Sequence, residues 1–181
     1  MKKTFVLLLL CALALTGCSA GLPEILFDEA SEGLVSVILR DYNDGTIHYD
    51  TIGPGGLRQP AQPFDGEPVE ILAAPSDCFE SYTDGHVKNR LVKTELLDES
   101  GASVEIDDTL QRIFELAAEQ EHVMTQLRVL RLAGRHFVTA EWNVNFWDPH
   151  VLYYFDPAAD KLTELYTYDA TQVVGLKILN L

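Results

Sequence analysis

The side chains that could carry chemistry in this sequence are five histidines, three cysteines and an excess of carboxylates. A zinc hydrolase needs paired histidines around a glutamate on one helix face, and Glu121-His122 has no such partner. No serine is followed three residues later by lysine, as in one class of serine hydrolases. The segment Gly53-Pro54-Gly55-Gly56 contains a proline, and no Lys-Ser or Lys-Thr pair follows it, unlike in a phosphate-binding loop. We therefore predict no catalytic residue, no metal site and no cofactor.

The first seventeen residues have the layout of a secretory signal. Lys2 and Lys3 give a positive start, and residues 5–15 form an apolar run without a charge. That run covers about half of the ~20 residues that a membrane-spanning helix needs. The segment therefore predicts a cleavable signal rather than a transmembrane anchor.

The signal ends in Leu15-Thr16-Gly17-Cys18, which resembles the lipobox of bacterial lipoproteins. The resemblance implies that the chain is cut before Cys18 and that Cys18 carries a diacylglycerol, whose two acyl chains hold a protein firmly on a membrane. The alternative is an ordinary secretory signal cut among the small residues 17–20. The remainder resembles only uncharacterised lipoproteins of Gram-positive bacteria, which favours a Gram-positive cell membrane. The resemblance also implies that an aspartate after the lipidated cysteine would signal inner-membrane retention in Gram-negative cells. This chain has Ser19 at that position, so an outer membrane is the second possible location.

The organisation that follows is a signal peptide at 1–17, a lipidated cysteine and tether at 18–33, and a single domain at 34–181. Removing the signal takes away two lysines and no acid, so the formal net charge falls from −15 to −17. Such a charge argues against nucleic acid as a partner, because phosphates would be repelled.

In the domain Cys78 has no cysteine to pair with, and the neighbouring Asp77 carboxylate raises the pKa of its thiol. We predict that Cys78 is buried and inert.

The hydrophobic pattern predicts an α+β domain dominated by an antiparallel β-meander. Asn43-Asp44-Gly45 predicts an N-terminal β-hairpin, because glycine accepts the positive φ of the turn. One helix is expected at about 107–120, with an acidic N-cap and an apolar face that packs on the sheet. N-terminal hairpins are expected to extend or flank that sheet. The strands of the meander are expected near 122–132, 136–146, 150–156, 161–168 and 172–180.

Aromatic residues gather in the C-terminal strands, and alternation along a strand sends some of them to a solvated face. Trp147 stands in a Trp-Asp-Pro turn, and either Tyr153 or its neighbour must point away from the core. Exposed tryptophan and tyrosine are typical of contact surfaces. Trp147 and Tyr153 are therefore the candidate binding surface.

The sequence favours a non-enzymatic, membrane-tethered binding or scaffold module that engages an envelope protein or a wall polymer. A hydrolase with two carboxylates far apart in sequence is the first alternative, and a deep cleft holding such a pair would favour it. A structural spacer without a specific ligand is the second.

Replacing the lipidation residue tests the location. We expect Cys18→Ala to release the protein from the membrane or to block its processing, because no acyl chain can then be attached. Fractionation of cells into membrane and released material measures this. A Cys18→Ala protein that stays on the membrane in normal amount would contradict the lipobox interpretation.

Overall fold

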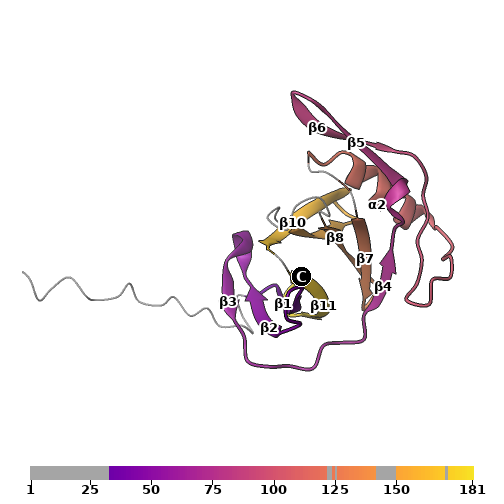
Figure 1. Cartoon of the computed structure of the whole chain (residues 1–181). Coiled ribbons are helices and arrows are strands. Elements are labelled where there is room, and N and C mark those ends of the chain that lie inside the picture. The colour runs from indigo at the N-terminus through magenta and orange to yellow at the C-terminus, as the bar shows by residue number, and fades with distance from the viewer. Residues whose placement is uncertain (1–32, 122–123, 125, 142–149, 170) are drawn as a thin grey trace, which may run out of the picture.

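The described part of the chain builds two antiparallel β-sheets, an α-helix and a projecting ribbon of two strands (Figure 1). The computed structural model describes residues 33–121, 124, 126–141, 150–169 and 171–181. Within them, one sheet has the strand order β11-β1-β2-β3 and the other the order β10-β9-β8-β7-β4. The β-strands are β1 Val35–Asp41, β2 Ile47–Ile52, β3 Arg58–Pro60, β4 Glu70–Ala73, β5 Phe79–Asp84, β6 His86–Leu91, β7 Gln126–Leu132, β8 Arg135–Glu141, β9 His150–Asp156, β10 Lys161–Tyr168 and β11 Thr171–Ile178. The helical segments are η1 Pro54–Gly56, η2 Ser76–Cys78 and α2 Asp108–Ala118. The predicted α+β fold, mostly antiparallel with a packed helix, is confirmed.

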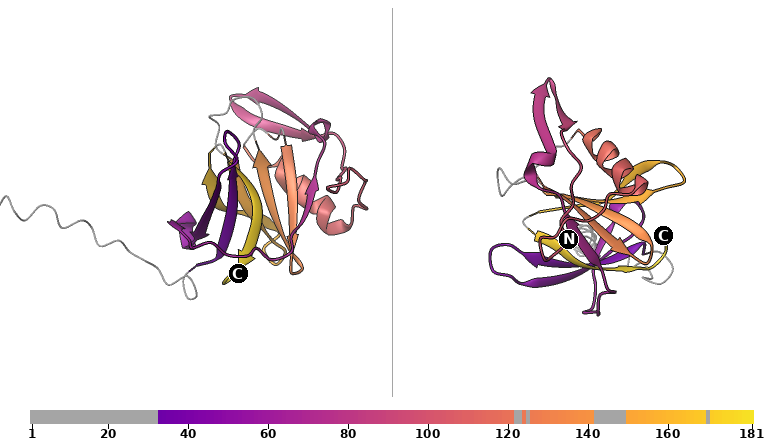
Figure 2. Two further views of the ribbon diagram at one scale, coloured as in Figure 1. Left: turned by 60° about the horizontal axis from the view of Figure 1, so that its bottom comes forward. Right: turned by 90° about the vertical axis from the view of Figure 1, so that its right-hand side faces the viewer.

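Two hydrophobic cores join three layers, which the right-hand view of Figure 2 shows edge-on. The first core lies between the two sheets. It includes Val35, Val37, Leu39, Ile52, Val173 and Leu176 from the four-stranded sheet and Leu130, Leu132, Phe137 and Leu152 from the five-stranded sheet. The second core lies between the other face of the five-stranded sheet and α2 with the β5–β6 ribbon. It includes Leu72, Leu110, Ile113, Phe114, Leu127, Val129, Val138 and Tyr153. The five-stranded sheet is therefore covered on both faces.

Helix α2 forms where its sequence predicts it. The Asp107 side chain caps the first turn by accepting a hydrogen bond from the Leu110 backbone N–H at 2.8 Å. Leu110, Ile113, Phe114 and Ala117 are completely buried, as their helical spacing predicts. The Phe114 ring stacks on Phe79, with 5.7 Å between ring centroids, so the helix also holds the base of the β5–β6 ribbon.

Strand β11 is not part of the meander that the sequence predicts. Strands β7 to β10 are neighbours in sequence order, but β11 pairs with β1 in the other sheet. Gly175 permits this pairing, because a Cβ atom there would lie 2.8 Å from the Cδ1 atom of Ile38. The first and last strands of the domain thus lie side by side, and the N-terminal hairpin belongs to a second sheet instead of extending the first.

Aspartates fix three tight turns. Asp41, at the end of β1, accepts a hydrogen bond from the Asn43 backbone N–H at 2.7 Å, and the predicted hairpin at 43–45 is present. Asp98 and Asp156 each accept two such bonds from backbone N–H groups two to four residues ahead. These turns satisfy backbone groups that the strands leave unpaired.

The hydrophobic pattern also predicts a hairpin with strands at 86–97 and 103–106, and the structure differs from that prediction here. Strand β6 ends at Leu91 and pairs with β5, and only single bridges join Leu97 to Ala73 and to Ser103. The ribbon is tied to the end of α2, because the Asn89 side chain donates to the Gln120 carbonyl at 2.8 Å. Since an isolated two-stranded ribbon is only marginally stable, these contacts hold it in place.

A carboxylate faces the space between the two sheets. Asp50 on β2 is paired with Val37, whose side chain belongs to the first core, and only 3% of the Asp50 side chain is exposed. The Arg58 Nε atom on β3 lies 2.9 Å from Asp50 Oδ2. A buried charge is stable only when it is paired, so Arg58 compensates Asp50 and ties the short edge strand β3 to the sandwich.

Removing this arginine should cost stability. We expect Arg58→Ala to lower the free energy of unfolding by about 1–3 kcal/mol, because it leaves a buried carboxylate without its partner. Urea denaturation measures the change. The control is Arg90→Ala, which breaks the exposed ion pair with Glu80 and should cost less than about 1 kcal/mol. Equal losses in the two variants would show that Arg58 does not compensate a buried charge.

Candidate functional site

Tyr153 is not part of a surface. It is 2% exposed and lies in the core between the five-stranded sheet and α2, so the prediction of an exposed Tyr153 is wrong. The physical reason is that this sheet has no solvated face in its middle: Thr139, on the side predicted to be wet, is completely buried. Burial and the nearby charge of Glu164 raise the pKa of Tyr153. Trp147 and Cys18 lie outside the described residues.

Cys78 is buried, as predicted. Its Sγ atom lies 3.7 Å from the carbonyl oxygen of Glu95. Burial raises the pKa of the Cys78 thiol, and the charges of Asp77 and Glu95 raise it further. Because the thiolate is the nucleophile, this cysteine is a poor candidate for catalysis.

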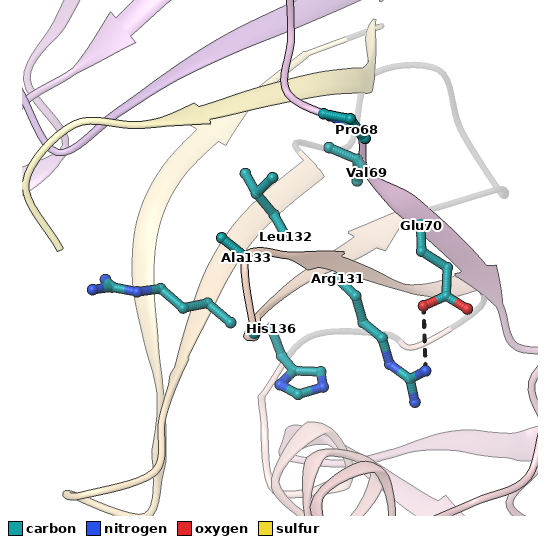
Figure 3. A pocket seen from close by; sticks show the side chains of 9 residues that line it. Pro68, Val69, Glu70, Arg131, Leu132, Ala133 and His136 are labelled. Atoms are coloured by element: carbon teal, nitrogen blue, oxygen red, sulfur yellow. Dashed lines mark hydrogen bonds and ion pairs between the residues drawn. The ribbon is translucent and has the colours of Figure 1, made fainter.

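A hollow of about 640 Å³ surrounds the turn between β7 and β8 (Figure 3). We call it the arginine hollow. Its lining consists of Pro68, Val69, Glu70, Arg131, Leu132, Ala133, Gly134, Arg135 and His136. Three of these residues are basic or can become so, and Glu70 is the one carboxylate among them. This lining therefore does not hold the carboxylate pair that a glycosidase-type hydrolase would need.

Glu70, Arg131 and His136 form a row across three neighbouring strands. Arg131 on β7 is the register partner of Glu70 on β4 and of His136 on β8, so the three side chains share one face of the sheet. Figure 3 shows the Glu70 carboxylate reaching Arg131, and the Arg131 Nη1 atom lies 3.3 Å from Glu70 Oε2. The Arg131 Nε atom is buried and makes no hydrogen bond to any described residue. Glu70 thus satisfies only part of the guanidinium group.

His136 adds a neutral ring to this row. Burial lowers the pKa of His136, and the charge of Arg131 lowers it further, while Asp107 and Glu70 oppose the shift. The ring packs edge-on against Phe155, with 6.5 Å between centroids. Because its pKa lies below the ordinary value, His136 is mostly uncharged at pH 7, and the positive charge of the hollow comes from the arginines.

Arg135 supplies the second positive charge. It is the register partner of Leu132, so it lies on the sheet face opposite to Arg131. Its Nη1 atom is buried and has no hydrogen-bond partner in the part of the chain that the structure describes. Unmet guanidinium N–H groups at a concave surface can bind carboxylate or phosphate oxygens.

The turn that carries these residues is strained. Ala133 has φ 49° and Gly134 has φ 76°, as a two-residue turn of type I′ requires at both positions. Glycine accepts such angles freely, whereas alanine pays for the close approach of its Cβ to the backbone. Backbone strain tends to occur at functional sites, and here it coincides with the arginine hollow.

The sequence carries one local signal for this site. Arg131 and Arg135-His136 flank a Gly-containing turn in a chain with only 13 lysines and arginines against 28 acidic residues. His136 belongs to no catalytic or metal-binding motif, so sequence spacing alone does not single it out. What the sequence could not show is that Glu70, 61 residues earlier, is the neighbour of Arg131.

Within the described ranges, no three or more His, Cys, Asp or Glu side chains come together in a way that could hold a metal ion. None of the helices in the same ranges has the length and apolar composition needed to cross a membrane. Comparison with protein-family models, with curated proteins and with solved structures gave no match to this chain.

Relieving the turn strain should stabilise the domain. We expect Ala133→Gly or Ala133→Asn to raise the free energy of unfolding by about 1 kcal/mol, because both residues accept positive φ more readily than alanine. Chemical denaturation measures the gain. Gly134→Ala, which adds strain at the next position, is the matched control and should lower stability. A loss of stability in both Ala133 variants would contradict the strain.

Proposed function

We propose that this chain is a lipoprotein anchored through Cys18 on the extracytoplasmic face of the cell membrane, and that its domain is a non-enzymatic binding module. The anchor rests on the N-terminal sequence, with its charged start, apolar run and lipobox. The binding role rests on the arginine hollow. Its ligand is an anionic group carried by an envelope protein or a wall polymer.

The observation that carries the proposal is the unmet hydrogen-bonding capacity of Arg131 and Arg135. Each arginine has a buried N–H group without a partner among the described residues, and leaving such a donor unsatisfied costs about 1–3 kcal/mol. These two nitrogens are themselves enclosed, but 27% of the Arg131 side chain is exposed beside Glu70, so an anionic ligand in the hollow can reach that part of it. Guanidinium bonds to carboxylate or phosphate are also stronger than bonds between neutral groups.

The overall charge restricts the form of the ligand. At −15 for the whole chain, long-range repulsion disfavours an extended polyanion. A ligand that presents one anionic group and an uncharged remainder avoids this repulsion. Pro68, Val69 and Leu132 in the lining offer apolar surface for the remainder.

The hollow lies at the end of the sandwich where the chain enters from the tether. Leu34, which precedes β1, accepts a hydrogen bond from the Leu179 backbone N–H after β11. Near this end of β11, the Leu176 carbonyl oxygen accepts a hydrogen bond from the Glu67 backbone N–H. Pro68, which follows Glu67, lines the hollow. The tether therefore joins the domain at the same end as the hollow, so partners at or near the membrane surface can reach it.

Crosslinking and pull-down of the full-length, lipidated protein from its native membrane tests the proposal. We expect one partner near stoichiometry with the wild type, and at least about tenfold less of it with Arg131→Ala/Arg135→Ala, because each lost charged hydrogen bond weakens binding by roughly 1.5–3 kcal/mol. The control is Arg40→Ala, which removes an exposed arginine on β1 and should keep the partner.

Two outcomes would contradict the proposal. Recovery of the protein alone from the wild-type membrane would remove the binding role. Equal recovery of a partner with the double arginine variant would keep a binding role but exclude the arginine hollow as its site.

A further inference from the structure

The described lining of the arginine hollow carries one positive charge in excess. Arg131 and Arg135 each contribute one positive charge, and Glu70 contributes one negative charge. Burial and the neighbouring Arg131 hold the pKa of His136 below its ordinary value, so this ring is mostly uncharged at and above pH 7. The other side chains of that lining are neutral. An anion that enters the hollow therefore meets a single unit of net positive charge.

The sheet holds Glu70 beside Arg131. The two residues are register partners on β4 and β7, and Glu70 Oε2 lies 3.3 Å from the Arg131 Nη1 atom (Figure 3). The Glu70 side chain is 50% exposed and the Arg131 side chain is 27% exposed, and both line the hollow. A ligand anion that approaches the Arg131 guanidinium group therefore also approaches the Glu70 carboxylate.

Further carboxylates lie on the other side of Glu70. A second hollow, of about 260 Å³, shares Val69 and Glu70 with the arginine hollow and is also lined by Asp98 and Glu99. The Ser100 hydroxyl and nearby backbone N–H groups donate hydrogen bonds to Asp98 and lower its pKa, so Asp98 stays ionised. The negative charge on this side opposes any additional negative charge on a ligand in the arginine hollow.

The free-energy cost of taking an anion out of water rises steeply with its charge. In the Born description this cost scales with the square of the charge, so a doubly charged group pays about four times as much as a singly charged group of the same size. Its attraction to the single excess positive charge of the hollow only doubles. Arg131 and Arg135 are half-buried, and solvent screens such charges less than fully exposed ones. The balance therefore favours the singly charged group.

We propose that the arginine hollow selects a singly charged oxyanion, such as a carboxylate or a phosphodiester, over a doubly charged phosphate monoester, and that Glu70 sets this preference. The inference rests on the proposed binding role of the hollow and specifies the charge of its ligand. Glu70 sets the preference because it cancels the charge of one of the two arginines. With a neutral side chain at position 70 the hollow would carry two positive charges, which match a doubly charged group.

The test is an NMR titration of the full-length chain in uncharged detergent micelles at about pH 8 and matched ionic strength, with acetate, dimethyl phosphate and methyl phosphate as probes. Methyl phosphate is doubly charged there, because the second pKa of a phosphate monoester is ~6, whereas the other two are singly charged. We expect acetate or dimethyl phosphate to bind at least about tenfold more tightly than methyl phosphate. Equal or tighter binding of methyl phosphate would overturn the charge selection but keep the hollow as an anion site. Binding of no probe would overturn the selection and also count against the hollow itself.

One substitution tests the role of Glu70. Glu70→Gln keeps the shape of the side chain and removes its charge, so it should raise the affinity for methyl phosphate by about tenfold more than the affinity for the singly charged probes. The control is Glu164→Gln, which makes the same change at an exposed residue of β10, on the opposite edge of the five-stranded sheet, and should leave the ratio of affinities unchanged. The Glu70 side chain is half exposed, so Glu70→Gln is expected to fold. An unchanged ratio in Glu70→Gln, or an equal change in Glu164→Gln, would overturn the role of Glu70. A partner whose recovery depends on Arg131 and Arg135 would still stand in that case, so the two proposals fail separately.

Discussion

The structure depends on one constraint, which is that the five-stranded sheet must bury both of its faces. Strands whose side chains are apolar on both faces of a sheet must be covered on both faces. Here one face is covered by the four-stranded sheet and the other by α2 with the β5–β6 ribbon. Tyr153 and Tyr154, adjacent on β9, consequently pack in different cores. The surface that we propose for binding therefore lies at an end of the sandwich, where the strands stop.

The two ends differ because the first and last strands of the domain are partners. Pairing of β1 with β11 brings the N-terminal side of the described domain and the C-terminal residues to one end, and the crossover from β10 to β11 marks the other. We call the first the tether end, because the proposed tether would join the domain there. The tether end carries the strained turn and the arginine hollow. The proposed lipid anchor at Cys18 would place this end toward the membrane.

Much of the fold could be predicted because its signals are local. The Asp107 cap and the apolar spacing after it specify α2, and Asn43-Asp44-Gly45 specifies the first turn. The β5–β6 ribbon was missed because β5 is almost entirely exposed and has no hydrophobic alternation. The partner of β11 was missed because a short connection does not say which edge the next strand joins. The candidate site depends on contacts between distant segments, which local signals do not specify. The exposed Tyr153 was a wrong prediction because it assumed a solvated sheet face, and the pairing of Arg131 with Glu70 joins segments far apart in the sequence.

The central claim is that partners are bound at the tether end of the sandwich, and site-specific photo-crosslinking in intact cells tests it most directly. A photoreactive amino acid at Pro68, in the lining of the arginine hollow, would be compared with one at Thr83, an exposed residue of the β5–β6 ribbon. The account predicts a discrete adduct from position 68 and none from position 83. An adduct from position 83 alone, or no adduct from position 68 in the full-length protein, would contradict it.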